Sequence, residues 1–529
     1  MDLKKTQRAP TPYTVSSSTV VFKNEQGNRP IYNGRLAERV GPSISLYNKT
    51  LATLKTDLNN WTTIVPTPDE LEMVDALFAV APDSYSKEDK RPTRMLPCIS
   101  ALLGVPLESE DEQSETRVTG VAFARQAVQG NKKQAVLVYA QWKNEFATSG
   151  DAGIQVAHTY RKHICEYGYS DIRNVSSCPC ILISIQGPYI CFFGAVFAHA
   201  FIVQPVTEYI FLGQAEKDLG ERITFVAQVF HAVSKAVKSL KEEYGRLSPS
   251  VVPFNEFRLP RPTYVNAATD LMCRLQTLTL HDLFTFDGRS KHDHRRAMFF
   301  GYLGDKSVVV KFCKKYGRDA HELLAGHGLA PQLHLVVEVL GGHVMVVMDY
   351  LPDARPANVL FRRVGPTKGT AHMTALSKPV LDNVQKAVHL LHDSGYVFGD
   401  LRMANIMVTD DEPPRAMLVD FNWAGKEGEA VYPENLNVTG IKWASDVCRS
   451  GLVKKEHDLY MLEQLAKGDP PWQLGKRSAS EELGPKAAKR AASVKTSRAN
   501  WIFLEDIGSK RRVRGFDVFR KVLLLLDLI

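Results

Sequence analysis

The sequence predicts an α+β protein with two domains, and three observations indicate it. The chain of 529 residues is 44% hydrophobic and 23% charged, which is ordinary globular composition and enough for two or three cores. Residues 1–245 mix strand-like and helix-like patterns. The stretch SPSVVPFNEFRLPRPTY then brings four prolines together, as linkers often do. We therefore place an N-terminal α/β domain at residues 1–245, a linker at 246–264 and a second domain at 265–529.

Charge and cysteine content exclude some classes of protein. The formal net charge of +8 and the pI of about 8.9 are mild for this length and do not define a dedicated nucleic-acid binder, although nucleic acid stays open as a partner. The eight cysteines are scattered, and the close pair Cys178 and Cys180 lacks the second pair or the histidines of a zinc site. Together with a polar N-terminus that has no apolar leader-like segment, this predicts an intracellular chain with reduced thiols.

One uncharged stretch could either cross a membrane or form strands. Residues 181–203, ILISIQGPYICFFGAVFAHAFIV, carry no formal charge over a length that would suffice for a bilayer. Gly187 and Pro188 interrupt the stretch, and both halves are rich in β-branched and aromatic residues. We therefore predict two buried strands joined by a tight turn, and no membrane partner.

The N-terminal domain carries one motif that could bear chemistry. Residues 141–143, Gln-Trp-Lys, follow a strand-like AVLVYA and resemble half of a restriction-endonuclease-like core, in which a metal-binding acid and a lysine hold the attacking water. Cys98 stands where the upstream aspartate of such a core would be, and the acids of 108–115 lie in a polar loop. We expect an inactive relic of a nuclease rather than an active one; ordinary charges at a strand end are the simpler alternative.

The second domain opens with strand patterns. We predict strands at 283–286 (LFTF), 297–303 (AMFFGYL) and 307–312 (SVVVKF), the last two joined by a turn at Gly-Asp. A charged helix is predicted at 316–328, before two more strand-like stretches, LHLVVEVL and HVMVVMDYL. These elements precede the polar residues that carry the functional argument.

Four polar residues have the chemistry of phosphoryl transfer. Lys311 lies in VVVKF, Asp400 and Asn405 are five positions apart in YVFGDLRMANIMV, and Asp420 follows in MLVDFN. The reaction requires a lysine for the α and β phosphates, oxygen ligands for Mg²⁺, and a carboxylate that takes the proton of the acceptor hydroxyl. Asn405 and Asp420 carry the hard oxygens that Mg²⁺ prefers. Each residue alone has a plainer interpretation, as a snorkelling lysine or a turn-forming side chain, and only the ordered set indicates a site.

In this order and spacing the four residues resemble the signatures of protein kinases: the strand lysine, the catalytic loop, and the metal-binding Asp-Phe-Gly triplet. More narrowly, SGYVFGDLRMANIMV, LVDFNWAGKEGEAVYP and EHDLYMLEQL are similar to the fungal-type protein kinase family of mushroom-forming fungi. The likeness covers about residues 265–470, and the N-terminal part resembles the region that accompanies such kinases. It implies a two-lobed protein-kinase-like domain preceded by an α/β restriction-endonuclease-like domain.

The resemblance assigns roles residue by residue. It makes Asp400 the catalytic base, Asn405 and Asp420 the Mg²⁺ ligands, and Lys311 the anchor of the ATP phosphates. Arg402 stands where kinases usually have a lysine near the γ-phosphate.

Other positions follow from the same resemblance. Asp458 in EHDLYML resembles the buried helix aspartate that holds the backbone of the catalytic loop. The hinge that meets adenine corresponds to residues 348–351, with cofactor contacts at Met348, Asp349 and Tyr350.

The acid that would pair with the strand lysine has two candidates on the predicted helix. Glu322 has the usual side chain of that position. Asp319 has Leu323 one turn further along the same helix face, so that an acid and an apolar side chain share this face, as the helix requires. We therefore choose Asp319 as the cofactor-site residue.

The sequence also departs from the family pattern. The triad at 398–400 reads FGD and lacks the arginine that usually receives an activation-loop phosphate. The triplet at 420–422 reads DFN, where we expect Asn422 to take the positive φ in place of glycine. FDGRSKHDHRR at 286–296 stands in place of a glycine-rich loop. About seventy residues follow Asp458, which predicts a short helical lobe.

Basic residues gather toward the C-terminus. The segment 475–500, GKRSASEELGPKAAKRAASVKTSRAN, is poor in aromatic residues and predicts a flexible insert. Its two basic clusters, with KRRVR at 510–514, resemble a nuclear-import signal, which puts the nucleus ahead of the cytoplasm. A solvated tail is the alternative.

The set predicts ATP- and Mg²⁺-dependent transfer of the γ-phosphate to serine or threonine hydroxyls of an unidentified protein. Two alternatives stay open. A pseudokinase adaptor would bind partners without turnover, and a small-molecule kinase of the aminoglycoside or choline type would use the same residues with another acceptor. Binding of Mg²⁺ with ATP at Asp420 separates enzyme from adaptor, and a peptide groove beside residues 426–445 separates the acceptors.

Overall fold

The computed structural model describes residues 6–85, 90–108, 120–124, 134–146, 150–214, 218–248, 257–265, 269–284, 297–364, 370–438, 440–468 and 472–473. These residues form two compact units, of which the first holds those within 1–363, 372–436 and 443–470. In the second unit, Thr370 and Ala371 pair with Gln473 and Trp472. The stretches 286–296, 475–500 and 510–514 lie outside the described residues, and so do the acids at 110–115.

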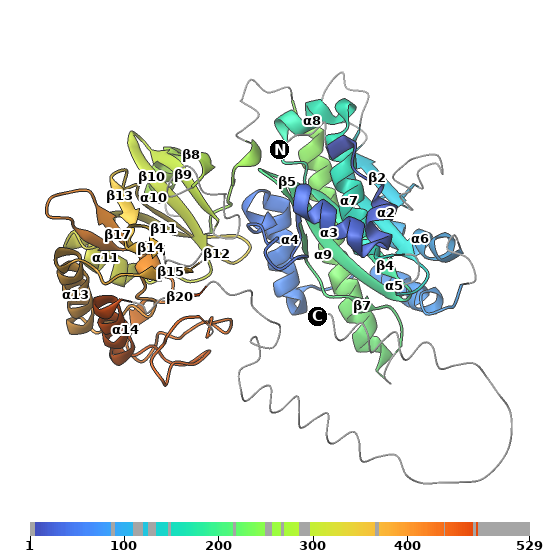
Figure 1. The fold of residues 1–529 in the computed structure, drawn as a ribbon. Coiled ribbons are helices and arrows are strands. Elements are labelled where there is room, and N and C mark those ends of the chain that lie inside the picture. The colour runs from blue at the N-terminus through green and yellow to red at the C-terminus, as the bar shows by residue number, and fades with distance from the viewer. Residues whose placement is uncertain are drawn as a thin grey trace, which may run out of the picture. The chain divides into compact units, whose positions relative to one another are not determined.

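The N-terminal part of the first unit contains a mixed sheet with helices (Figure 1). Its strands are β1 (Ile31–Tyr32), β2 (Gly120–Ala124), β3 (Ala135–Lys143), β4 (Cys180–Gln186), β5 (Tyr189–Phe197), β6 (Phe201–Pro205) and β7 (Ile210–Phe211). Its helices are α2 (Pro12–Ser17), α3 (Thr19–Asn28), α4 (Lys49–Asn59), α5 (Pro68–Val80), α6 (Lys90–Leu103), α7 (Ala152–Cys165), α8 (Ser170–Val175) and α9 (Leu219–Gly245). The strand order is β1-β6-β5-β4-β3-β2, with β7 beside β5. β3 runs parallel to β4 and β1 parallel to β6, and the other pairs are antiparallel.

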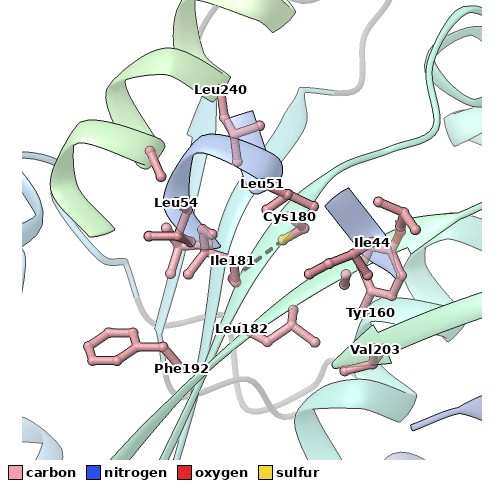
Figure 2. Close-up of a cluster of buried hydrophobic side chains, with 14 of the residues drawn as sticks. Ile44, Leu51, Leu54, Tyr160, Cys180, Ile181, Leu182, Phe192, Val203 and Leu240 are labelled. Atoms are coloured by element: carbon pink, nitrogen blue, oxygen red, sulfur yellow. Dashed lines mark hydrogen bonds between the residues drawn. The ribbon is translucent and has the colours of Figure 1, made fainter. Parts of the chain in front are cut away.

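Helices cover both faces of this sheet. Every residue of β3 is buried, as a strand covered on two sides requires. Neighbouring side chains of a strand point to opposite faces, and the ring of Phe192 contacts Phe230 of α9 whereas the ring of Phe193 reaches Gly153 of α7. Figure 2 shows leucines of α4 and α9 gathered beside Ile181 of β4. The uniform hydrophobicity of these strands therefore reflects burial inside the fold.

The prediction for residues 181–203 is confirmed. β4 and β5 pair antiparallel, from Cys180 against Ala195 to Gln186 against Tyr189, and Gly187 turns between them with φ of 57°. No helix within the described ranges has the length and the apolar stretch that a bilayer span requires.

The nuclease-like motif lies at the end of a central strand. Residues 141–143 close β3 and are buried, whereas Cys98 lies on helix α6 and not at a strand end. Across the parts of the chain that the structure describes, no group of three or more His, Cys, Asp or Glu side chains could hold a metal ion. The nuclease-like class of this part stays a prediction.

The C-terminal part of the first unit begins with a five-stranded antiparallel sheet. Its strands are β8 (Leu278–Leu283), β9 (Met298–Leu303), β10 (Lys306–Cys313), β11 (Leu333–Val339) and β12 (His343–Asp349), in the order β11-β12-β10-β9-β8. Helices α10 (Thr269–Gln276) and α11 (Arg318–Gly326) accompany it. The predicted strands at 297–303 and 307–312 are confirmed, with Gly304 at φ of 59° in the turn between them. The strand predicted at 283–286 lies earlier, because β8 ends at Leu283.

Helices and short hairpins follow this sheet. The helices are α12 (Ala357–Leu360), α13 (Lys378–Asp393) and α14 (Lys455–Lys467). The short strands are β13 (Ala354–Pro356), β14 (Arg362–Val364), β15 (Thr370–Met373), β16 (Tyr396–Val397), β17 (Ile406–Thr409), β18 (Ala416–Leu418), β19 (Gly425–Lys426) and β20 (Trp472–Gln473). The loop between β16 and β17 carries Asp400, and the end of β18 leads to Asp420.

Candidate active site

Strand β10 carries Lys311 into a cleft. Lys311 shares a strand face with Val309 and Cys313, and all three line the cleft. The opposite face of the strand packs into the core through Val308 and Val310. Lys311 is 7% exposed, and its Nζ donates to Asp420 Oδ1 at 2.6 Å. The sequence alone gave no sign of this direct pairing.

Asp420 follows β18 in an unusual backbone conformation. Its φ is 70°, in the left-handed region, which costs a non-glycine residue about 1 kcal/mol or more. The expectation that Asn422 takes the positive φ is wrong, because Asn422 is absent from the positive-φ residues in the described chain. The left-handed residue of the triplet is therefore Asp420, two positions earlier, which also contacts Lys311.

The catalytic-loop candidate Asp400 is closely held by two neighbours. Arg402 donates to it twice, from Nε to Oδ1 and from Nη2 to Oδ2, the latter at 2.6 Å. Asn405 donates through Nδ2 to Oδ2 at 2.8 Å and to the backbone oxygen of Asp400 at 2.9 Å. Burial raises the pKa of Asp400 above its ordinary value, and the Arg402 guanidinium opposes this shift. The contacts that favour the charged form of Asp400 thus come from Arg402 and Asn405 of its own loop.

The backbone of this loop is fixed by Asp458, as predicted. Asp458 is buried in the first turn of α14, where Oδ2 accepts from the amide of Phe398 and Oδ1 from the amide of Gly399, both at 2.8 Å. His392 Nε2 lies 3.1 Å from Oδ2 of the same carboxylate. Hydrogen bonds to charged acceptors are stronger than neutral ones, so this contact rigidly places the loop that carries Asp400.

A short hairpin brings the two proposed Mg²⁺ ligands to one edge. β17 pairs with β18 from Ile406 against Leu418, and Val419 donates from its backbone to Asn405 O at 2.9 Å. The Nδ2 of Asn405 is engaged by Asp400, which leaves its amide oxygen as the atom that could meet a cation. An amide oxygen and the Asp420 carboxylate are donors that suit Mg²⁺, which usually takes one or two protein ligands besides phosphates and water. The residues present fit this ion.

The hinge candidates also line the cleft. Met348, Asp349 and Tyr350 lie there with Leu351, next to the strand that bears Lys311. The side chain of Asp349 is engaged elsewhere, since Oδ1 lies 2.6 Å from Nε2 of His334.

One cleft of about 710 Å³ unites most of the candidates. Lys311, Arg402, Asn405 and Asp420 line it, and Asp400 lies directly behind Arg402. A drug-sized ligand occupies such a volume. The lysine and the carboxylates of 400 and 420, which are far apart in sequence, therefore meet on one side of the fold.

The predicted acid on α11 is not brought to the lysine. Asp319 and Glu322 are both exposed, and Glu322 pairs with Arg318 at 2.8 Å. Lys311 pairs with Asp420 instead. The helix begins at Arg318, so Asp319 lies in its first turn, on the solvent side.

Helix α11 reaches the site through a histidine that the sequence did not single out. His321 is fully buried and stacks on Phe421, with ring centroids 4.4 Å apart and planes at 5°. Its Nε2 lies 2.8 Å from Pro331 O and its Nδ1 2.6 Å from the Tyr316 hydroxyl. A carbonyl only accepts, so Nε2 carries a proton. Burial lowers the pKa of His321 to about 4.

Comparisons with known proteins give partial likenesses. No family model matches the chain. Over 120 residues, 21% of the chain, it is 33% identical to the probable SapB synthase of Streptomyces coelicolor, and it spans 12% of the length of that protein. A solved structure, the kinase PK-1 of Cydia pomonella granulovirus, is similar at 16% identity over 42% of this chain and 82% of that chain, with a TM-score of 0.30. These likenesses are too limited to define the family, and the geometry of the cleft carries the functional argument.

Proposed function

We propose that the C-terminal part is a two-lobed, kinase-like phosphotransferase that moves the γ-phosphate of ATP to serine or threonine hydroxyls of a protein. The observation that supports this best is that Lys311, Asn405 and Asp420 line one cleft of nucleotide size, where Asn405 also binds Asp400. Phosphoryl transfer depends on positioning and on charge stabilisation, and these side chains are suited to both.

Each residue has a role in this proposal. Asp400 orients the acceptor hydroxyl and takes its proton, and Arg402 turns from Asp400 toward the transferred phosphate. Lys311 leaves Asp420 to bind the α and β phosphates. Asn405 and Asp420 would hold Mg²⁺, which supplies charge neutralisation of the phosphates when bound.

A pseudokinase adaptor is the second candidate, and one observation favours it. The two carboxylates that should serve catalysis are both occupied by cationic side chains, Asp400 by Arg402 and Asp420 by Lys311. A cleft whose charges are already paired can be a stable scaffold without turnover.

The N-terminal part is proposed as a nuclease-like relic that serves as a folded platform. Its support is the position of residues 141–143 at the end of β3, together with Cys98 on a helix. Location in the nucleus rests on the basic stretches alone and stays a prediction.

The decisive test compares the full-length protein with Asp400→Asn. With Mg²⁺ and radiolabelled ATP, the wild type should phosphorylate a general protein acceptor such as myelin basic protein, and Asp400→Asn should lose about 10²-fold or more of this rate, because the base is gone. Binding of a fluorescent ATP analogue should change little. Asp393→Asn, at the exposed end of α13, is the matched control.

Three outcomes would decide against the proposal. Equal transfer rates in the wild type and Asp400→Asn would remove the catalytic assignment. Nucleotide binding without transfer would indicate the adaptor, and transfer to an aminoglycoside or choline but not to protein would reassign the acceptor.

A further inference from the structure

The first turn of helix α14 makes contacts to two different parts of the site. Asp458 holds the backbone of the catalytic loop through Phe398 and Gly399. Its neighbour His457 is 2% exposed and points to the segment that follows Asp420. No role for His457 follows from the proposed reaction itself.

The hydrogen bonds of His457 define its protonation. Nδ1 lies 3.3 Å from the backbone nitrogen of Lys454, which can only donate, and 3.1 Å from the hydroxyl of Tyr432. Nδ1 is therefore the acceptor. Nε2 then carries the proton and donates to Asp446 Oδ1 at 3.1 Å, while the other oxygen of Asp446 accepts from Lys454 Nζ at 2.7 Å.

Tyr432 connects this network to the cleft. It belongs to the wall segment, residues 431–435, all of which line the cleft. Tyr432 is 1% exposed and packs against Trp423 and Trp443, with ring centroids 5.9 Å from each. Its backbone nitrogen donates to Gly451 O at 2.9 Å. The wall segment is thus anchored by one buried side chain.

We infer that His457 is a positioning residue that fixes the wall segment through Tyr432 and Asp446, and so shapes the acceptor side of the cleft. The inference rests on the proposed function only in calling this side the acceptor side. Asp446 and Tyr432 come from opposite ends of the segment between Asp420 and α14, and His457 ties both to the helix that holds the catalytic loop. The histidine then holds this segment in place without a phosphorylated side chain. This agrees with the FGD triad, which has no arginine to bind an activation-loop phosphate.

Variants can separate the bonds of His457. Tyr432→Phe removes only the hydroxyl. His457→Asn keeps an acceptor near the Lys454 amide but loses the contact with Asp446, and His457→Gln can restore a donor at the Nε2 position. His389→Gln, exposed on α13, is the matched control.

Hydrogen exchange of the full-length variants is the first measurement. We expect exchange at residues 430–436 to rise about tenfold in Tyr432→Phe and His457→Asn, the effect of one lost buried hydrogen bond on local opening. Exchange at 396–408 should stay within about twofold, because Asp458 is intact, and His457→Gln should recover part of the protection.

Transfer to myelin basic protein is the second measurement. The KM for this acceptor should rise about tenfold in the same two variants, with the KM for MgATP changed by less than about twofold. Unchanged exchange at 430–436 in both variants would overturn the inference, as would equal rises in both KM values. If the two variants exchange faster at residues 430–436 but the wild type itself transfers no phosphate, His457 remains the anchor of the wall segment. Only the proposed function would then be refuted.

Discussion

At the scale of single residues, the contact between Arg402 and Asp400 controls the charge of the site. Two hydrogen bonds join the guanidinium to the carboxylate, which is 5% exposed. Burial disfavours the charged form of Asp400 and raises its pKa, and Arg402 opposes this rise. In the proposed reaction Arg402 turns away from Asp400 before the acceptor hydroxyl approaches, so one side chain both favours the charged form of Asp400 and covers it.

This contact gives a pH dependence with a defined sign. A general base works as the carboxylate, so kcat should fall as the pH drops through the pKa of Asp400, which burial raises above the ordinary value. Arg402→Met removes the cation that opposes this rise, and the acidic limb of the profile should move to higher pH. Profiles of kcat against pH for the wild type and Arg402→Met test this. A limb that stays in place or moves to lower pH would contradict the assignment of Asp400 as the base.

The residues that the sequence did and did not predict differ in where their partners lie. Asp400, Asn405 and Asp420 stand in local motifs whose spacing is readable, and the structure places them together. The stacking of His321 on Phe421 and the bond of His457 to Tyr432 join residues 100 and 25 positions apart, with no recurring local pattern around them. Such contacts depend on tertiary packing, which a single sequence does not display.

At the scale of elements, the start of α11 packs closely against the turn that follows Asp420. Gly317 donates from its backbone to Phe421 O at 2.8 Å, and a Cβ at this position would lie 2.3 Å from Ala424 O. The helix can approach the Asp-Phe-Asn turn only because this residue has no side chain. The approach also explains why Asp319 stays in solvent: His321, and not an acid, faces the site.

Alanine substitutions on this helix test the junction. Gly317→Ala should lower the free energy of unfolding by about 1–3 kcal/mol, because the turn must move away from the added methyl group. Gly326→Ala, at the far end of the same helix with no atom within 4 Å of its Cβ, should be neutral or slightly stabilising. Urea unfolding of the two variants provides the comparison, and equal stabilities would contradict the close approach.

The buried histidine of α11 should make stability depend on pH. His321 has a pKa of about 4 in the folded chain and an ordinary value of 6.5 when unfolded. The unfolded state therefore binds more protons between these values, and the stability contributed by the neutral ring is lost as pH falls below about 6.5. From pH 7 to pH 5 the loss should be about 2 kcal/mol.

The matched measurement uses His321→Phe, which keeps an aromatic ring beside Phe421. Urea titrations at pH 7 and pH 5 give the fall in unfolding free energy for each protein. This fall should be about 2 kcal/mol smaller in His321→Phe than in the wild type. Parallel pH dependence of the two proteins would show that His321 is not the titrating group.

At the scale of the whole molecule, Arg258 of the predicted linker binds the N-terminal part. Arg258 is 3% exposed and donates to the backbone oxygens of Arg173, Ser176 and Phe197. Its guanidinium lies 4.0 Å from the ring centroid of Phe197, and burial lowers its pKa to about 10. The proline content of this segment gave no indication that one of its arginines donates to three backbone carbonyl groups.

Arg258 should therefore matter to the stability of the N-terminal sheet. Arg258→Gln leaves buried carbonyl groups without donors and should cost about 2–4 kcal/mol of unfolding free energy. Arg246→Gln, whose side chain is 79% exposed beside Glu242, should change it by less than about 0.5 kcal/mol. Urea unfolding followed by far-UV circular dichroism would measure both, and similar values would show that Arg258 is dispensable.

The pair formed by Lys311 and Asp420 has a consequence for the order in which ligands arrive. The Lys311 ammonium already neutralises the Asp420 carboxylate. A free divalent cation would have to displace this ammonium, so the affinity of Asp420 for the cation without nucleotide should be poor. A nucleotide that arrives with its cation would give both residues a new partner at once: the phosphates would bind Lys311, and the metal ion would bind Asp420. Under the proposed function, the cleft should therefore bind a cation that is complexed with nucleotide better than a bare cation.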